Sequence, residues 1–67
     1  MRELLERLVD EMVSKGIRFE DAQREFEKRF ITQALSSTEG NLSKAADLLG
    51  IHRNTLSRKL TEYRIRR

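Results

Sequence analysis

The chain has 67 residues, with no cysteine, no proline and one histidine, His52. This composition excludes a disulfide framework, a cysteine-based zinc site and a metal site built from several histidines, so we expect no metal and no cofactor. A chain this short buries only about 60% of its unfolded surface, and without a covalent or metal staple it gains stability by associating with a partner subunit.

The net charge of +3 is unevenly distributed along the chain. Residues 1–40 hold 7 Lys/Arg and 9 Asp/Glu, a net charge of −2, whereas residues 41–67 hold 7 Lys/Arg and 2 Asp/Glu, a net charge of +5. A basic rear half indicates a polyanionic partner, although a solvated basic end made of Arg64, Arg66 and Arg67 is the alternative explanation.

Membrane and secretory signals are missing from the sequence. No apolar run approaches the roughly 20 residues that span a bilayer, and no basic start precedes an apolar stretch. We therefore expect a cytoplasmic protein with no membrane partner.

Two amphipathic helices are predicted in the front half. The first extends from about Arg2 to Lys15, where apolar residues recur at helical spacing between charged ones and Gly16 follows as the terminator. The second extends from about Phe19 to Ser37. Their stripes hold more apolar residues than a small three-helix core could hide, which predicts a dimer interface rather than packing within one chain only. The expected interface residues are Leu4, Leu5, Leu8, Val9, Met12, Val13, Phe19, Phe26 and Phe30.

Two short helices around a glycine turn are predicted in the rear half. Asn41 can cap a helix that ends at Gly50, and a second helix extends from about His52 or Arg53 to Tyr63. Two helices joined by a three- or four-residue turn that contains glycine are typical of a helix-turn-helix. The small or apolar residues expected between them are Ala45, Ala46, Leu49, Ile51, Leu56 and Leu60.

The last helix has a polar face without acidic residues. Every member of this face can bond to bases or phosphates: His52, Arg53, Asn54, Thr55, Ser57, Arg58 and Lys59. The first residues of a recognition helix meet the base edges, so we expect base contacts from His52, Arg53 and Asn54. The alternative is the solvated face of an ordinary helical hairpin, for which charges of both signs are expected.

The segment from Gly40 to Arg64 resembles the Fis family, whose module also ends the NtrC-type enhancer-binding regulators of bacteria. It reads GNLSKAADLLGIHRNTLSRKLTEYR and meets every fixed position of the pattern G-N-x-(S/T)-x-A-A-x-x-L-G-I-x-R-x-T-L-x-(R/K)-K-L. The upstream stretch EFEKRFITQALSSTEGN extends the likeness to roughly residues 19–64. The resemblance implies a single all-α domain of four helices, in which the first two helices of two subunits intertwine as a dimer core (residues 1–40). The last two form a helix-turn-helix followed by a basic tail (residues 41–67).

The resemblance also implies roles for matching residues. The matches of His52 and Arg53 lie at base edges. The residues expected at the DNA backbone are Asn41, Ser43, Lys44, Thr55, Ser57, Arg58 and Lys59. Two positions depart from the family: Ser57 stands where Fis itself has a basic residue, and His52 stands where asparagine or serine is common.

The motif and the resemblance together predict sequence-specific binding of double-stranded DNA by a homodimer, at an approximately palindromic site. The resemblance implies bacterial transcription regulation, in the cytoplasm and associated with the nucleoid. Two roles stay open: a short Fis-like regulator, or the output domain of a larger NtrC-type activator that would reach the RNA polymerase machinery through its other domains. The second is favoured, because Fis carries β-hairpin arms before its first helix and no strand pattern precedes the first helix here.

Other function classes find little support. There is no cysteine nucleophile, no glycine-rich phosphate loop and no acidic residue near His52 in sequence, so no catalytic residue is predicted and the chain is not expected to be an enzyme. The main alternative is a protein-interaction or dimerisation module without specific DNA binding. Such a module would not require a face of the last helix that lacks acidic residues.

Overall fold

Four helices make up the fold. The computed structural model describes residues 1–65. Its helices are α1 (Arg2–Ser14), α2 (Phe19–Ser37), α3 (Leu42–Leu49) and α4 (Arg53–Tyr63). No strand occurs within these described residues, so the predicted all-α fold is confirmed. Arg66 and Arg67, which were counted with the basic tail, lie outside the described residues.

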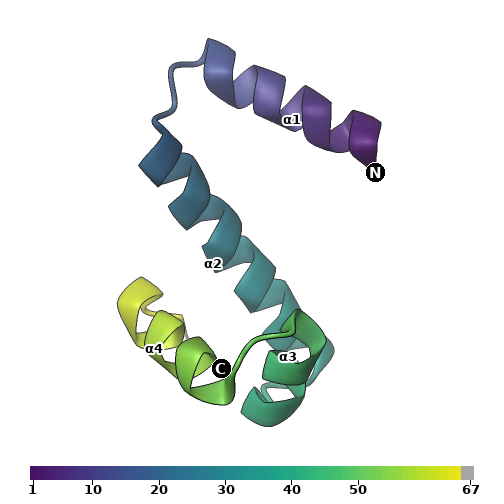
Figure 1. Ribbon diagram of the computed structural model, residues 1–67, viewed down its shortest axis with the longest axis vertical. Helices are drawn as coiled ribbons and strands as arrows, with labels where there is room; N and C mark the ends of the chain where they lie inside the picture. Colours follow the sequence, from purple (N-terminus) through teal and green to yellow (C-terminus); the bar gives the residue numbers. More distant parts are fainter. Residues whose placement is uncertain (66–67) are drawn as a thin grey trace.

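The helices are arranged as an arm and a compact end (Figure 1). α1 extends away from one end of α2, and the connection between them passes through Gly16, which has a φ of +75°. α3 and α4 gather around the other end of α2 and pack against one another. None of the helices in residues 1–65 is long and apolar enough to cross a membrane.

Asn41 and Gly50 define the two ends of α3. The Asn41 side-chain oxygen accepts a hydrogen bond from the Lys44 backbone N–H at 2.9 Å, which caps the start of α3. Gly50 ends α3 with a φ of +70°, a left-handed conformation that costs glycine little. Both predictions for this helix are thus confirmed, and α4 restarts only three residues after Gly50.

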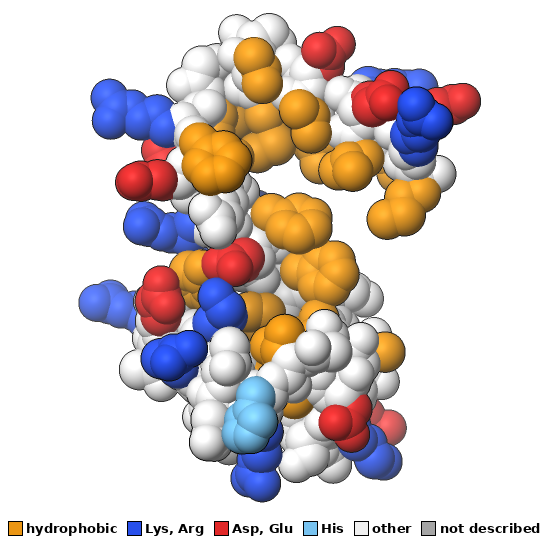
Figure 2. All heavy atoms as spheres, viewed as in Figure 1, with side chains coloured by type: hydrophobic (Ala, Val, Ile, Leu, Met, Phe, Trp, Pro, Cys, Tyr) orange, Lys and Arg blue, Asp and Glu red, His pale blue; other side chains and the backbone are white. Residues whose placement is uncertain are grey.

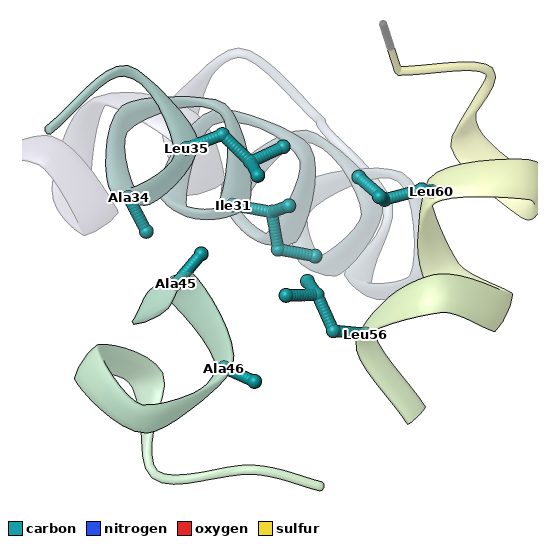
Figure 3. Close-up of a cluster of buried hydrophobic side chains, with 7 residues drawn as sticks. All are labelled: Ile31, Ala34, Leu35, Ala45, Ala46, Leu56 and Leu60. Atoms are coloured by element: carbon teal, nitrogen blue, oxygen red, sulfur yellow. The ribbon is translucent and has the colours of Figure 1, made fainter. Parts of the chain in front are cut away.

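A small core lies where α2, α3 and α4 meet (Figure 3). Its buried residues are Ile31, Ala34, Leu35, Ala45, Ala46, Leu56 and Leu60. Ala45 and Leu56 are both 0% exposed, and the small alanine side chains allow α3 to lie close to α2. Figure 3 shows Leu56 of α4 directed at Ile31 of α2, so the core connects the helix-turn-helix to the long helix.

α1 and the first part of α2 present their apolar residues to solvent. α1 has no buried residue, and Leu4 and Val13 are each 70% exposed. Figure 2 shows apolar side chains gathered on the inner side of the angle between α1 and α2. There, Phe26 and Phe30 lie with ring centroids 5.2 Å apart. All nine residues predicted for the dimer interface are therefore accessible to a partner in the single chain, Met12 being the least exposed of them.

Candidate nucleic-acid interface

The polar face of α4 is turned to solvent. Arg53, Asn54, Ser57 and Arg58 are exposed and Thr55 is half-buried, while the helix holds its apolar side chains in the core. Neither arginine is held in an ion pair within residues 1–65. Cationic and hydroxyl side chains that are accessible in this way can bond to phosphates and base edges.

His52 caps α4 rather than belonging to its outer face alone. Its Nδ1 accepts a hydrogen bond from the Asn54 backbone N–H at 3.0 Å. A ring nitrogen accepts only when it is unprotonated, so the capping imidazole carries its proton on Nε2. His52 is thus the N-cap residue of α4, and its side chain satisfies one of the N–H groups at the start of this helix.

The expected backbone-contact residues of α3 lie at its N-terminal end. Asn41, Ser43 and Lys44 are exposed, and the capping bond between Asn41 and Lys44 orders this end of the helix. A helix N-terminus carries partial positive charge and unpaired N–H groups, both of which favour a phosphate. α3 thus contributes exposed polar groups from a different element than α4.

Lys59 lies apart from the other predicted contact residues. Its Nζ is 3.1 Å from Oε1 of Glu27 on α2, and its side chain is only 27% exposed. Lys59 follows Leu56 by three residues and precedes Tyr63 by four, so helical spacing places it on the inner side of α4. Lys59 is therefore not on the exposed face of α4 with which it was predicted to lie.

Glu27 and Tyr63 are part of the same cluster and were missed from the sequence. The Tyr63 hydroxyl donates a hydrogen bond to Oε2 of Glu27, so the two carboxylate oxygens are bound by two different side chains of α4. We call Glu27, Lys59 and Tyr63 the α2–α4 junction. It borders a shallow hollow of about 290 Å³ that Glu62 also lines.

The hydrogen bonds of the junction set its protonation. The bond from Tyr63, followed by that from Lys59, lowers the pKa of Glu27 from 4.5. The same bond to Glu27, followed by burial, raises the pKa of Tyr63 to about 12. At neutral pH the junction therefore combines a carboxylate, an ammonium group and a neutral phenol, and its net charge is zero.

No group of three or more His, Cys, Asp or Glu side chains that could hold a metal ion occurs within residues 1–65. Basic and amide groups are instead displayed on α4 and at the start of α3.

Comparison with known proteins agrees with this arrangement. Residues 22–63 match the family described as "Bacterial regulatory protein, Fis family". The DNA-binding transcriptional regulator NtrC of Azospirillum brasilense is 45% identical over 53 residues, which are 79% of this chain and 11% of that protein. A putative Fis-like DNA-binding protein of Xylella fastidiosa (strain Temecula1) is 55% identical over 40 residues, which are 60% of this chain and 44% of that protein.

Other relatives carry the same names. The DNA-binding transcriptional regulator NtrC of Escherichia coli (strain K12) is 52% identical over 42 residues, which are 63% of this chain and 9% of that protein. No solved structure gives a significant match. The chain thus spans about a tenth of the length of these NtrC relatives and less than half of the Fis-like protein.

The family match extends from early in α2 to the end of α4, which is more than half of the chain. The description of this family is that of regulatory proteins. The predicted resemblance is confirmed by this match and by the NtrC and Fis-like relatives: the chain belongs to the Fis family of bacterial regulatory proteins.

Proposed function

We propose that this chain is a DNA-binding domain for transcription regulation, which binds an approximately palindromic duplex as a homodimer with α4 in the major groove. The observation that carries the proposal is the solvent-facing, non-acidic side of α4, which begins directly after the Gly50 turn. A helix presented in this way fits the groove and is attracted to the polyanion. The relatives named as DNA-binding regulators support the same function.

Within this proposal the contacts divide by their place in the fold. His52, Arg53 and Asn54 stand at the start of α4 and are assigned to base edges. The backbone contacts are assigned to Asn41, Ser43, Lys44, Thr55, Ser57 and Arg58. Lys59 is left out of this set because its Nζ is bound to Glu27.

The front half, residues 1–40, is assigned to dimerisation. An apolar groove of about 530 Å³ lies between α1 and α2 and is lined by Leu8, Met12, Phe26 and Phe30, with the Glu25–Arg29 ion pair at its margin. A second copy of the chain would cover this groove and the α1 stripe and so remove a large apolar surface from water. Two copies related by a two-fold axis present two α4 helices, which is why the target should be a palindrome.

The relatives support a regulatory setting for this proposal. The chain would act as the DNA-binding part of an NtrC-type regulator or as a short Fis-like regulator in the bacterial cytoplasm and nucleoid. Any link to RNA polymerase would pass through other parts of a longer protein.

The test is a titration of the chain into two labelled duplexes, one a palindrome selected from random sequence and the other a scrambled version of it. Fluorescence anisotropy is followed at two salt concentrations. We expect two chains per palindrome, tighter binding to the palindrome than to the scrambled duplex, and an affinity that falls steeply with salt because phosphate contacts release counterions. Dimers that bind neither duplex at low salt would instead support the alternative, a protein-interaction module.

Two substitutions on α4 separate base contacts from backbone contacts. Arg53→Ala should weaken binding to the palindrome by about 1–3 kcal/mol and relax the preference at one base pair. Arg58→Ala should weaken binding to both duplexes alike and lower the salt slope by about one. Arg2→Ala, which removes an exposed arginine of α1, is the control and should change neither quantity.

A further inference from the structure

The α2–α4 junction joins the recognition helix to the long helix through both oxygens of one carboxylate. Lys59 and Tyr63, one helical turn apart on α4, donate to Oε1 and Oε2 of Glu27 respectively. Within residues 1–65, these two are the only side-chain hydrogen bonds that connect one helix to another. Every other side-chain bond of this part of the chain joins residues no more than four positions apart.

The junction differs in its surroundings from the other ion pairs. The side chains of Lys59 and Glu27 are 27% and 28% exposed, whereas the side chains of the other three pairs are 57–90% exposed. The exposed pairs lie within single helices and are screened by water, so they contribute little to the arrangement of helices. The partly desolvated junction pair is screened less, and its hydrogen bonds are correspondingly stronger.

Directional bonds at this point restrain how α4 is rotated about its own axis. Leu56 and Leu60 attach α4 to the core by apolar contacts, which have no preferred direction. Hydrogen bonds require aligned donors and acceptors, so the bonds to Glu27 select one rotation of the helix. Because Arg53 and Arg58 are on the same helix, that rotation also decides which of their atoms face a duplex.

The same carboxylate restrains a cation that would otherwise be available to DNA. The lysine side chain is a flexible four-carbon stem with a point charge, and a phosphate contact from it carries no sequence information. In the junction, the Lys59 ammonium group is directed toward α2 and its charge is neutralised by Glu27.

We infer that Glu27 is a positioning residue for DNA recognition, which sets the rotation of α4 through Tyr63 and Lys59 and keeps Lys59 off the phosphate backbone. The inference rests on the proposed function, since it concerns how that function achieves its preference for a sequence. Glu27 contacts no DNA itself, and its effect is on the ratio of specific to non-specific affinity.

The test compares Glu27→Gln with Glu62→Gln, using the palindrome and the scrambled duplex at several salt concentrations. Both substitutions remove one negative charge beside the same hollow, but Glu62 forms no hydrogen bond with Lys59 or Tyr63 within the described residues. Glu27→Gln should reduce the preference for the palindrome by roughly 5- to 10-fold and raise the salt slope by about one per chain, because Lys59 is released to a phosphate. Glu62→Gln should tighten binding to both duplexes alike and leave the preference unchanged.

A spectroscopic titration of Tyr63, the chain's single tyrosine, reports on the junction without DNA. The phenol should ionise near pH 12 in the wild-type chain and closer to its ordinary value of 10 in Glu27→Gln. An unchanged titration in the variant, or a change in palindrome preference no larger than that of Glu62→Gln, would overturn the inference.

A second variant, Lys59→Met, keeps the inference testable if Glu27→Gln does not fold. It retains the apolar stem and leaves the Tyr63 bond to Glu27 in place. The salt slope should then stay at the wild-type value, because Lys59 makes no phosphate contact; a slope lowered by about one would show that it does and would refute the inference. If the wild-type chain binds neither duplex, the proposed function fails together with the inference, whereas wild-type binding with unaltered specificity in the variants removes the inference alone.

Discussion

In the rear half of the fold, where α3 and α4 close on the C-terminal end of α2, most apolar side chains are buried, whereas in the front half, formed by α1 and the first part of α2, they are exposed. Leu56 is 0% exposed, while Phe19 at the start of α2 is 83% exposed. Both halves consist of amphipathic helices with apolar residues at helical spacing. The difference shows that such a pattern predicts a helix and its apolar side but does not say whether the same chain covers that side.

This contrast assigns different sources of stability to the two halves. The rear core is complete within one chain, because α2, α3 and α4 each contribute to it. The groove of the front half has apolar residues from only α1 and α2 and is open to solvent. Substitutions in the rear half should therefore act on the fold of each chain, and those in the front half should act on association.

The largest effect is expected from Leu56→Ala in the rear core. Removing a fully buried leucine leaves a cavity and should lower the free energy of unfolding by about 3 kcal/mol, a large part of the total for a chain this small. The matched control is Leu48→Ala, because Leu48 lies on α3 but is 63% exposed, and it should cost less than about 0.5 kcal/mol. Urea denaturation monitored by circular dichroism measures both, and equal losses would contradict the proposed core.

A smaller effect, on the stability of the dimer, is expected from Leu8→Ala on α1. Leu8 is half exposed in the single chain, so covering its remaining surface in both protomers should contribute about 2 kcal/mol to the dimer, or roughly 30-fold in Kd. Sedimentation equilibrium measures that constant. Glu6→Ala, on the same helix but paired outward with Arg2, is the control. Dissociation constants that are equal in the two variants would remove α1 from the interface.

The glycines of the two turns allow the halves to be compared by substitutions that carry the same backbone strain. Gly50 and Gly16 have φ values of +70° and +75°, and a Cβ added at either meets nothing within 4 Å. Alanine at each position should therefore cost about 1 kcal/mol from backbone strain alone. Only Gly50→Ala should weaken palindrome binding beyond its effect on stability, since the Gly50 turn orients α4. Anisotropy titrations under conditions where both variants are folded would show whether Gly16→Ala has the same effect, which would contradict this division.

The smallest effect is the pH dependence that the α2–α4 junction adds. The lowered pKa of Glu27 contributes stability that is present above pH 4.5 and is lost as the pH falls through the lowered value. The raised pKa of Tyr63 contributes stability that is present below pH 10 and is lost as the pH rises towards about 12. The stability difference between the wild-type chain and Glu27→Gln should thus be largest between these limits and shrink at both ends. Denaturation curves at a series of pH values test this, and a constant difference would argue against the junction.

The sequence by itself determined the helices, their ends and the family. The bounds of α2 agree with the prediction at both ends, and α1 ends at Ser14, one residue before its predicted end at Lys15. Asn41 and Gly50 specify the ends of α3 by chemistry local to each residue, namely a side-chain cap and a left-handed φ. Signals of this kind involve residues close together in the chain, which is why the sequence alone reveals them.

Only the tertiary structure decided which side chains meet across helices. Glu27 and Tyr63 are 36 residues apart, and nothing local to either one indicates the other. Helical spacing places Lys59 on the inner side of α4, but its partner depends on how α4 crosses α2, and that crossing follows from the small core around Leu56. That His52 caps α4 likewise became evident only from the direction in which its Nδ1 atom lies. Periodicity reports the angle of a residue around its own helix axis, whereas contacts between helices depend on packing, which no local pattern contains.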